Sequence, residues 1–326
     1  MAGPTMADVA RAAGISTALV SIVMRGVPGA SEATRSRVLR LADEMGYVPD
    51  QRARKLRQSS SRLIGVTFEL QQPFHGDLVE QLYAAASERG YEISLSAVAP
   101  SRADDAAVTT LLRERCEAAI LLGSRLDDAA LTTLAGRVPT LVVARRTAAA
   151  GVGVVRGDDV AGIALAVDHL VELGHRRIAH VDGADAPGSA DRRDGFAAAM
   201  ARHGLTGEVR TGGLTEEAGA RAMGELLDDA GPPSAVVAFN DRCATGVLDT
   251  LVHHGRRVPR DVSVVGYDDS RLARAPHVQM TTVSQDAPRL ARAAVDAALR
   301  LTAGDEPGET VLAPTLVQRS TTGPGV

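Results

Sequence analysis

The chain has 326 residues, 45% of them hydrophobic, which is enough for a small module and one or two larger lobes of a globular protein. Its longest apolar runs span about five residues, whereas a membrane helix needs roughly 20, so we expect no membrane span. The net charge of −4 is uneven: residues 1–62 hold ten basic and five acidic side chains, and the remainder hold 26 and 35. A basic segment on an acidic body favours a nucleic-acid-binding head.

Three short helices are predicted in residues 5–46. Thr5 and Asp8 have the spacing of a helix cap, and Gly14 can end that helix. Ser16 starts a second helix, and Ser31 starts a third that Gly46 ends. Inward faces at helical spacing are formed by Val9, Ala10, Ala13, Leu19, Val20, Val23, Val38, Leu41, Ala42 and Met45. This pattern predicts a helix-turn-helix, and a three-helix dimerisation bundle is the alternative.

Residues 49–61 are predicted to form a hinge helix and a linker. After Pro49, Ala53 and Leu56 fall three apart on one face, among the cations Arg52, Arg54, Lys55 and Arg57. A helix this short is marginal alone in water, so we expect it to order only on DNA, with Leu56 inserted in the minor groove. A flexible basic linker, which residues 58–61 continue, is the alternative.

The first sixty residues closely resemble the head of the LacI/GalR family of repressors, in TMADVARAAGIS (5–16), in Val-Ser (20–21) and in GVPGASEATRSRVLRLADEMGYVPD (26–50). The resemblance implies that Thr17, Ala18 and Ile22 read bases in the major groove of operator DNA. The chain departs from the family pattern at Leu19, Ile22, Arg25 and Asp50. Isoleucine cannot make the bidentate contact of arginine with guanine, so we expect an operator that differs from the common family half-site there. The predicted DNA-binding residues are Ser16, Thr17, Ala18, Ser21, Ile22, Arg25, Tyr47, Arg52, Ala53, Lys55 and Leu56.

From residue 63 onward, β-rich runs alternate with helical stretches, which predicts an α/β core of parallel sheets covered by helices. The predicted strands are 63–68, 92–98, 118–122, 140–144, 177–181, 235–239 and 262–267. The predicted helices are 77–89, 104–114, 159–173, 192–203, 216–230, 241–254 and 286–301. So many units predict two lobes, the architecture of a periplasmic-binding-protein-like core.

We therefore expect a DNA-binding head of residues 1–48, a hinge of 49–61 and an effector-binding and dimerisation core of 62–326. Within the core, the first lobe is expected to comprise 62–157 and 287–318, and the second 158–284. Residues 320–326 are expected to be a disordered tail.

Ligands of open α/β sheets bind beyond the carboxyl ends of the strands. The side chains that follow the predicted strands there give the candidate effector-binding residues Phe74, His75, Arg125, Arg145, Asn240 and Asp268. Amides, carboxylates and guanidiniums suit a polyhydroxylated ligand, because each hydroxyl group both donates and accepts hydrogen bonds. The alternative is that Asn240 caps its helix and Asp268 anchors a turn.

The core also resembles LacI/GalR proteins, in HLVELGHRRIAHVDG (169–183), AFNDRCATG (238–246), VPRDVSVVGYDD (258–269) and TTVSQD (281–286). The resemblance implies that Arg192, Asn240 and Asp268 hydrogen-bond an effector. A sugar or sugar derivative is the expected class. The lack of tryptophan and Leu214, where some sugar-binding relatives have an aromatic, weigh against a simple sugar, and the many arginines leave acidic or phosphorylated ligands open.

The expected function is therefore a repressor that binds a palindromic operator in double-stranded DNA as a homodimer and responds allosterically to a small ligand. No catalytic motif occurs, so we expect no enzyme, and we expect neither a cofactor nor a metal; Cys116 and Cys243 are expected to be buried free thiols. The amino-terminal residues lack the features of a secretion signal, so a cytoplasmic protein is expected. The alternative is a soluble sugar-binding protein that does not bind DNA.

Overall fold

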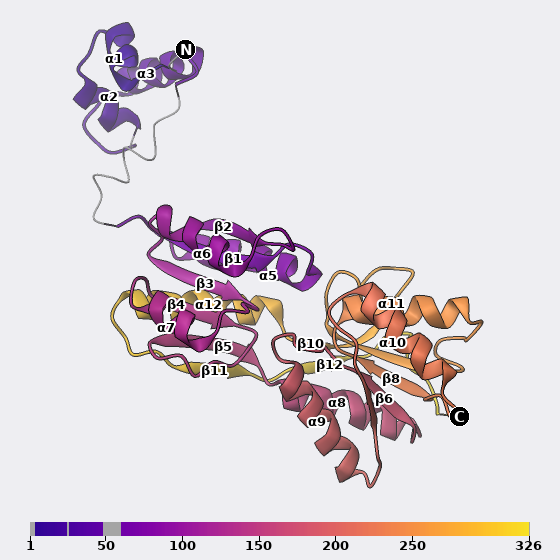
Figure 1. The fold of residues 1–326 in the computed structure, drawn as a ribbon. Helices are drawn as coiled ribbons and strands as arrows, with labels where there is room; N and C mark the ends of the chain where they lie inside the picture. Colours follow the sequence, from indigo (N-terminus) through magenta and orange to yellow (C-terminus); the bar gives the residue numbers. More distant parts are fainter. Residues whose placement is uncertain (1–3, 25, 48–59, 326) are drawn as a thin grey trace. The chain divides into compact units, whose positions relative to one another are not determined.

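The computed structural model describes residues 4–24, 26–47 and 60–325, and the chain divides into two compact units, Met1–Ser61 and Arg62–Val326 (Figure 1). The predicted hinge residues Arg52, Ala53, Lys55 and Leu56 lie outside the described residues, as does Arg25. Within those described ranges, no single helix is long and apolar enough to cross a membrane, although α1 and α2 pass that test as a pair bent by 105°.

The first unit contains the three predicted helices, α1 (Met6–Ala13), α2 (Thr17–Met24) and α3 (Glu32–Glu44). Thr5 and Asp8 form a reciprocal capping box, and Gly14 ends α1 in the left-handed conformation, with φ of 64°. The Ser16 and Ser31 hydroxyls accept hydrogen bonds from the backbone amides of Leu19 and Thr34. The predicted inward residues other than Leu19 form the core of this unit, with Leu41 and Met45 partly buried against it. Leu19 is partly exposed and does not belong to this core, so its inward assignment was wrong.

The first lobe of the second unit is a parallel sheet of strand order β11-β5-β4-β3-β1-β2. Its strands are β1 (Leu63–Glu69), β2 (Glu92–Val98), β3 (Ala118–Leu122), β4 (Thr140–Val143), β5 (Val152–Gly157) and β11 (Glu309–Leu312). Its helices are α5 (Pro73–Glu88), α6 (Asp104–Arg113), α7 (Asp128–Ala135) and α12 (Ala287–Thr302). One face of the sheet packs on α5 and α12, and the other packs on α6 and α7.

The second lobe repeats this architecture with strand order β12-β10-β9-β8-β6-β7, in which only the β10–β12 pair is antiparallel. Its strands are β6 (Ile178–Val181), β7 (Glu208–Arg210), β8 (Ala235–Ala238), β9 (Ser263–Asp268), β10 (Thr281–Ser284) and β12 (Thr315–Val317). Its helices are α8 (Asp159–Glu172), α9 (Ser189–Arg202), α10 (Glu216–Asp228) and α11 (Asp241–His253). Helices α8 and α9 cover one face, and α10 and α11 cover the other.

The predicted α/β fold is confirmed, and all seven predicted core strands and all seven predicted core helices occur within a few residues of their expected bounds. The sequence reading missed α7 and the strands β5, β7, β10, β11 and β12. Four of these strands have only three or four residues, too few for a clear hydrophobic period. Helix α5 begins at Pro73 and not at 77, because proline is well suited to the first helical turn.

Two expectations about the carboxyl terminus were wrong. Strand β12 pairs with β10 in the second sheet, so the first lobe does not extend to residue 318. The tail is also packed against the second lobe: the amide of Val264 donates to the Thr321 carbonyl oxygen at 2.8 Å, and the amide of Gly325 donates to that of Leu173 at 2.7 Å. These backbone hydrogen bonds supply the order that a polar, glycine-rich composition did not predict.

Candidate functional site

A cleft with a cavity volume of about 60 Å³ lies where the carboxyl ends of strands from both lobes face each other. Five of the predicted effector residues line it, namely Phe74, His75, Arg192, Asn240 and Asp268.

Arg192 is the most firmly held cation of the cleft. It lies on α9, its side chain is 6% exposed, and its Nε donates to Oδ1 of Asp159 at 2.9 Å. Its guanidinium group is stacked between the rings of Tyr267 and Phe239, 3.6 and 4.5 Å from their centroids. Burial alone would lower the pKa of Arg192, but the nearby carboxylate of Asp159 raises it above the ordinary value. The arginine is therefore a fixed donor with one orientation.

Asn240 does cap its helix, as the alternative reading proposed, and it also lines the cleft. Its Oδ1 accepts a hydrogen bond from the backbone amide of Cys243 at 2.7 Å. Its Nδ2 has only long contacts, 3.4 Å to Oε1 of Gln72 and 3.5 Å to the Leu214 carbonyl oxygen. The capping bond fixes the amide and leaves its two N–H groups for a ligand in the cleft.

Asp268, at the end of β9, has a φ of 109°, a strained value for a residue other than glycine. Its Oδ1 accepts a hydrogen bond from Nε2 of Gln285 at 2.8 Å. Burial raises the pKa of Asp268 to about 8, although Arg192 opposes this shift. Asp268 therefore presents its carboxyl group to the cleft, and with this pKa both the protonated and the ionised forms are accessible near neutral pH.

His75 is neutral, because burial lowers its pKa to about 4. Its Nδ1 accepts a hydrogen bond from the backbone amide of Glu69 at 3.0 Å, so the ring proton is on Nε2. Phe74 and His75 belong to the first turn of α5, which Pro73 starts. Together they give the first lobe an apolar ring and one N–H donor in the cleft.

The structure places the other two predicted residues outside this lining. Arg125 is exposed, pairs with Asp185 at 3.3 Å and lines an adjoining cavity of the first lobe. Arg145 donates through Nη2 to the Leu126 carbonyl oxygen at 2.6 Å, and its Nε is buried without a partner. Both follow predicted strands, but their long side chains extend sideways to the neighbouring loops.

Several lining residues were missed by sequence reasoning. They are Glu69, Gln72, Gly123, Ala144, Pro187, Phe239 and Gln285. Gln72 is 7% exposed and its Nε2 is buried with no hydrogen-bond partner in the structure, a costly state for an amide. Glu69 is the last residue of β1, so the carboxyl-end rule could have found it; Gln72 had no comparable signal.

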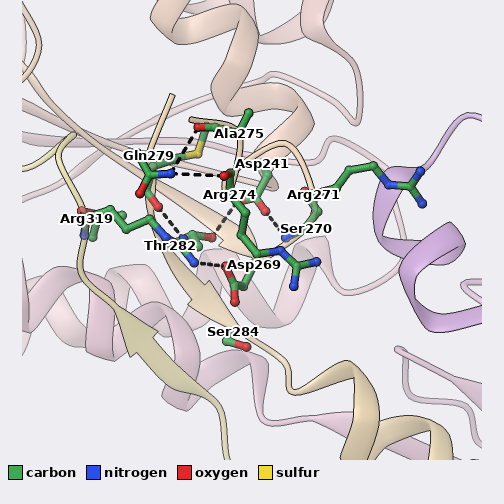
Figure 2. Close-up of polar contacts among 12 residues, drawn as sticks. Asp241, Asp269, Ser270, Arg271, Arg274, Ala275, Gln279, Thr282, Ser284 and Arg319 are labelled. Atoms are coloured by element: carbon green, nitrogen blue, oxygen red, sulfur yellow. Dashed lines mark hydrogen bonds and ion pairs between the residues drawn. The ribbon is translucent and has the colours of Figure 1, made fainter. Parts of the chain in front are cut away.

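The segment 269–280 joins β9 to β10 within the second lobe, and Figure 2 shows its polar contacts with Asp241, Thr282 and Arg319. Asp241, 1% exposed, anchors it by accepting hydrogen bonds from the Thr282 hydroxyl at 2.6 Å and the Ser270 amide at 2.7 Å. Burial raises the pKa of Asp241 to about 7. From this segment, Arg271 and Arg274 donate to the carboxylate of Asp77 on α5, at 2.9–3.2 Å. We call these contacts with Asp77 the lobe latch.

In the helix-turn-helix unit, Ser16, Thr17 and Ala18 are exposed at the start of α2. Ser21 and Ile22 are partly buried, and the Ile22 side chain lies against Gly29. Tyr47 packs against the core of this unit, and the guanidinium group of Arg35, which sequence reasoning missed, donates to the Val27 carbonyl oxygen at 3.0 Å. Of the predicted DNA-binding residues that the structure describes on α2, only Thr17 and Ala18, in its first turn, are fully exposed.

Of the two thiols, Cys243 is buried, and burial raises its pKa to about 12; Cys116 is partly exposed, so the expectation that both are buried was wrong. Within residues 4–24, 26–47 and 60–325, no group of three or more His, Cys, Asp or Glu side chains is arranged to hold a metal ion.

Comparisons with known proteins match both units. Residues 5–50 match the family of bacterial regulatory proteins described as the lacI family, and residues 167–322 match a periplasmic binding protein-like domain. The ribose operon repressor of Escherichia coli K12 is 31% identical over 300 residues, which cover 90% of this chain and 91% of the repressor.

Two solved structures are also similar. A LacI transcriptional regulator from a Rhodococcus species is 69% identical, covers 81% of this chain and 99% of its own, and has a TM-score of 0.80. The lac repressor dimer bound to operator and the anti-inducer ONPF is 28% identical, covers 99% of this chain and all of its own, and has a TM-score of 0.82.

Proposed function

The chain belongs to the LacI family of bacterial regulatory proteins, and from this premise we propose that it represses transcription as a homodimer bound to a palindromic operator, with a carbohydrate in the cleft as its effector. The proposal places the protein in the cytoplasm, with its DNA. The similar lac repressor structure is that of a dimer on operator, and the ribose operon repressor is named for the operon of a sugar.

The observation that carries the effector proposal is the polar lining of the cleft. Arg192 and Asn240 offer fixed donors, Asp268 offers a carboxyl group, and Gln72 has a buried amide nitrogen with no partner in the described residues. Neighbouring hydroxyl groups of a sugar would satisfy donors and acceptors together, and a ligand would remove the cost of the unpaired amide. Phe74 and Phe239 supply apolar surface for the C–H groups of the ring.

For DNA, the proposal assigns base contacts to the exposed first turn of α2. Thr17 and Ala18 are free to reach base edges, whereas Ile22 can contact only an apolar group such as a thymine methyl. The operator is therefore proposed to differ from the common family half-site at the base pair that Ile22 faces. Ligand and operator must affect each other's binding by the same factor.

The test is selection of duplexes by the full chain from a random DNA library, followed by fluorescence anisotropy with the selected duplex. We expect a palindrome, and we expect a carbohydrate from a panel of sugars, sugar acids, sugar phosphates and nucleosides to change the Kd for it. The variant Ile22→Arg should shift selection toward guanine in each half-site, while Ala33→Arg, an exposed position on α3, should not. Selection of no sequence, or of the common half-site by the unmodified chain, would contradict the DNA part of the proposal.

A further inference from the structure

The cleft between the lobes is nearly closed in this conformation. Its cavity volume is about 60 Å³, whereas pockets that enclose a small molecule have about 300–1,000 Å³. Arg192 and Asn240, its fixed donors, are only 5% and 3% exposed. The lobes must therefore move apart before a small molecule reaches these side chains, and the contacts that cross between the lobes control that motion.

Two ion pairs cross between the lobes on the side away from the lobe latch. Nη1 of Arg125, which follows β3 and leads into α7, is 3.3 Å from Oδ2 of Asp185 in the loop before α9. Nε of Arg146, which follows β4, is 3.0 Å from Oδ2 of Asp191 in the first turn of α9. The latch instead joins α5 to the segment that packs with α10 and α11, and these helices cover the opposite faces of the two sheets. We call the two ion pairs the flank clasp.

The flank clasp borders the cleft directly, and it reverses the charge pattern of the lobe latch. Each of its residues is one or two positions from a residue of the cleft lining, namely Gly123, Ala144, Pro187 or Arg192. In the clasp, guanidinium groups of the first lobe face carboxylates of the second, whereas in the latch the first lobe supplies the carboxylate. A slide or twist of one lobe would therefore separate opposite charges on both sides of the cleft. The ion pairs favour one relative orientation of the lobes, the closed one.

The flank clasp is also weak enough to open. The side chains of Arg125, Asp185 and Arg146 are 45%, 88% and 56% exposed, so water and ions reach both pairs. An exposed ion pair of this kind shifts an equilibrium by only about one- to fivefold. Salt reduces even that effect, because the screening length falls from about 10 Å at 0.1 M to about 3 Å at 1 M. The clasp therefore stabilises the closed lobes without locking them.

We propose that the flank clasp is a salt-sensitive gate of the cleft. Its two ion pairs hold the lobes closed, and their rupture lets the lobes separate on this side and admits a small molecule. The gate acts on any molecule that enters the cleft, so it depends neither on a carbohydrate effector nor on the operator sequence.

The chain contains no tryptophan, so Leu214→Trp, at a partly exposed position of the cleft lining, gives one indole reporter in the full chain. Quenching of its fluorescence by acrylamide, a neutral small molecule, measures access to the cleft. We expect the quenching constant to rise about two- to threefold from about 0.05 M to about 1 M sodium chloride. At low salt, Arg146→Met should raise it by a similar factor. The control is Arg257→Met, which breaks an exposed pair with Asp261 inside the second lobe and should not change it.

Asp191→Asn should match Arg146→Met, and the double variant should be no more open than either, because the two side chains act as one pair. The response to salt should shrink in all three variants. Hydrogen–deuterium exchange without the reporter is the second measurement: residues 184–191 should exchange faster at high salt and in Arg146→Met. A quenching constant and an exchange rate that neither salt nor Arg146→Met changes would overturn the gate. Additive effects of Arg146→Met and Asp191→Asn, or an equal effect of Arg257→Met, would overturn it too.

Discussion

The two lobes have the same strand order, yet their polar residues at the cleft differ in how firmly they are held. In the second lobe, Arg192 is ion-paired and stacked between two rings, and Asn240 is fixed by its capping bond. In the first lobe, Gln72 has an unpaired buried nitrogen and the Glu69 carboxylate has no hydrogen-bond partner in the described structure.

This difference indicates that the two lobes have different roles in ligand binding. Groups that are already oriented lose little freedom when a ligand binds, so the second lobe is suited to supply affinity. Groups without partners gain hydrogen bonds only when the correct ligand arrives, so the first lobe is suited to discriminate between ligands. The following predictions test that comparison, from the largest expected effect to the smallest.

Arg192→Met should have the largest effect, because it removes one partner of a buried ion pair and leaves Asp159, 4% exposed, without a counter-charge. We expect a loss of about 3–5 kcal/mol in the free energy of unfolding, measured by urea denaturation. Effector affinity should fall about 100-fold or more. The control is Arg202→Met, an exposed pair with Asp168, which should cost less than about 1 kcal/mol. Equal losses in the two variants would contradict the assignment of the second lobe as the rigid one.

The second prediction concerns pH. Burial raises the folded-state pKa of Asp268 to about 8 and that of Asp241 to about 7, from 3.8, so the folded state binds protons that the unfolded state has released. These two carboxyl groups should therefore make stability fall as pH rises from about 4, the unfolded-state pKa, to about 8, the folded-state pKa of Asp268. His75 and His180, whose pKa values burial lowers to about 4, have the opposite effect only below pH 6.5, where falling pH reduces stability.

Thermal unfolding from pH 5 to 9 measures this profile. The carboxyl and imidazole effects nearly offset each other up to about pH 6, so we expect a nearly flat stability there and a fall between about pH 6 and 8.5. Asp268→Asn should reduce the loss of stability above about pH 6. Asp249→Asn, at an exposed position on α11, should leave that loss unchanged. An alkaline loss of stability that persists in full in Asp268→Asn would show that Asp268 does not cause it.

Gln72→Leu should separate binding from stability. It removes the unpaired amide nitrogen of the first lobe, so the unliganded protein should unfold at the same or a slightly higher temperature. The effector should bind about tenfold more weakly, because it loses a hydrogen-bonding group. The exposed neighbour Gln71 provides the control variant Gln71→Leu, for which neither quantity should change. A clear loss of stability in Gln72→Leu would mean that the first lobe is as preorganised as the second.

Asp77→Asn, which weakens the lobe latch, should have the smallest effect. The side chains of Arg271 and Arg274 are 61% and 52% exposed, so the pairs are screened by water and salt. We expect effector affinity to fall by about threefold, with a difference that shrinks as salt rises. Asp296→Asn breaks a pair with Arg89 within the first lobe and should leave affinity unchanged. If the two variants changed effector affinity equally, the lobe latch would have no specific role in holding the two lobes together.

The sequence by itself determined the order of elements and the class of fold. Helical spacing and capping residues located α1, α2 and α3, because Thr5, Gly14, Ser16 and Ser31 act within one turn of their own backbone. Buried parallel strands such as β3 were predicted correctly because they appear in the sequence as short apolar runs. Five of seven predicted effector residues line the cleft. Four of them, Phe74, His75, Asn240 and Asp268, follow from the rule that ligands bind at the carboxyl ends of strands, which is local to each strand, and Arg192 was implied by the family resemblance.

Tertiary structure alone decided which polar side chains meet. Gln72 and Asn240 are 168 positions apart, and Asp77 and Arg271 are 194 apart, so no local pattern could pair them. The same holds for the tail, whose order comes from hydrogen bonds to β9 and α8 and not from its own composition. Backbone-local forces fix where each helix and strand begins, whereas burial, ion pairing and the state of each carboxyl group depend on neighbours that only the folded chain brings together.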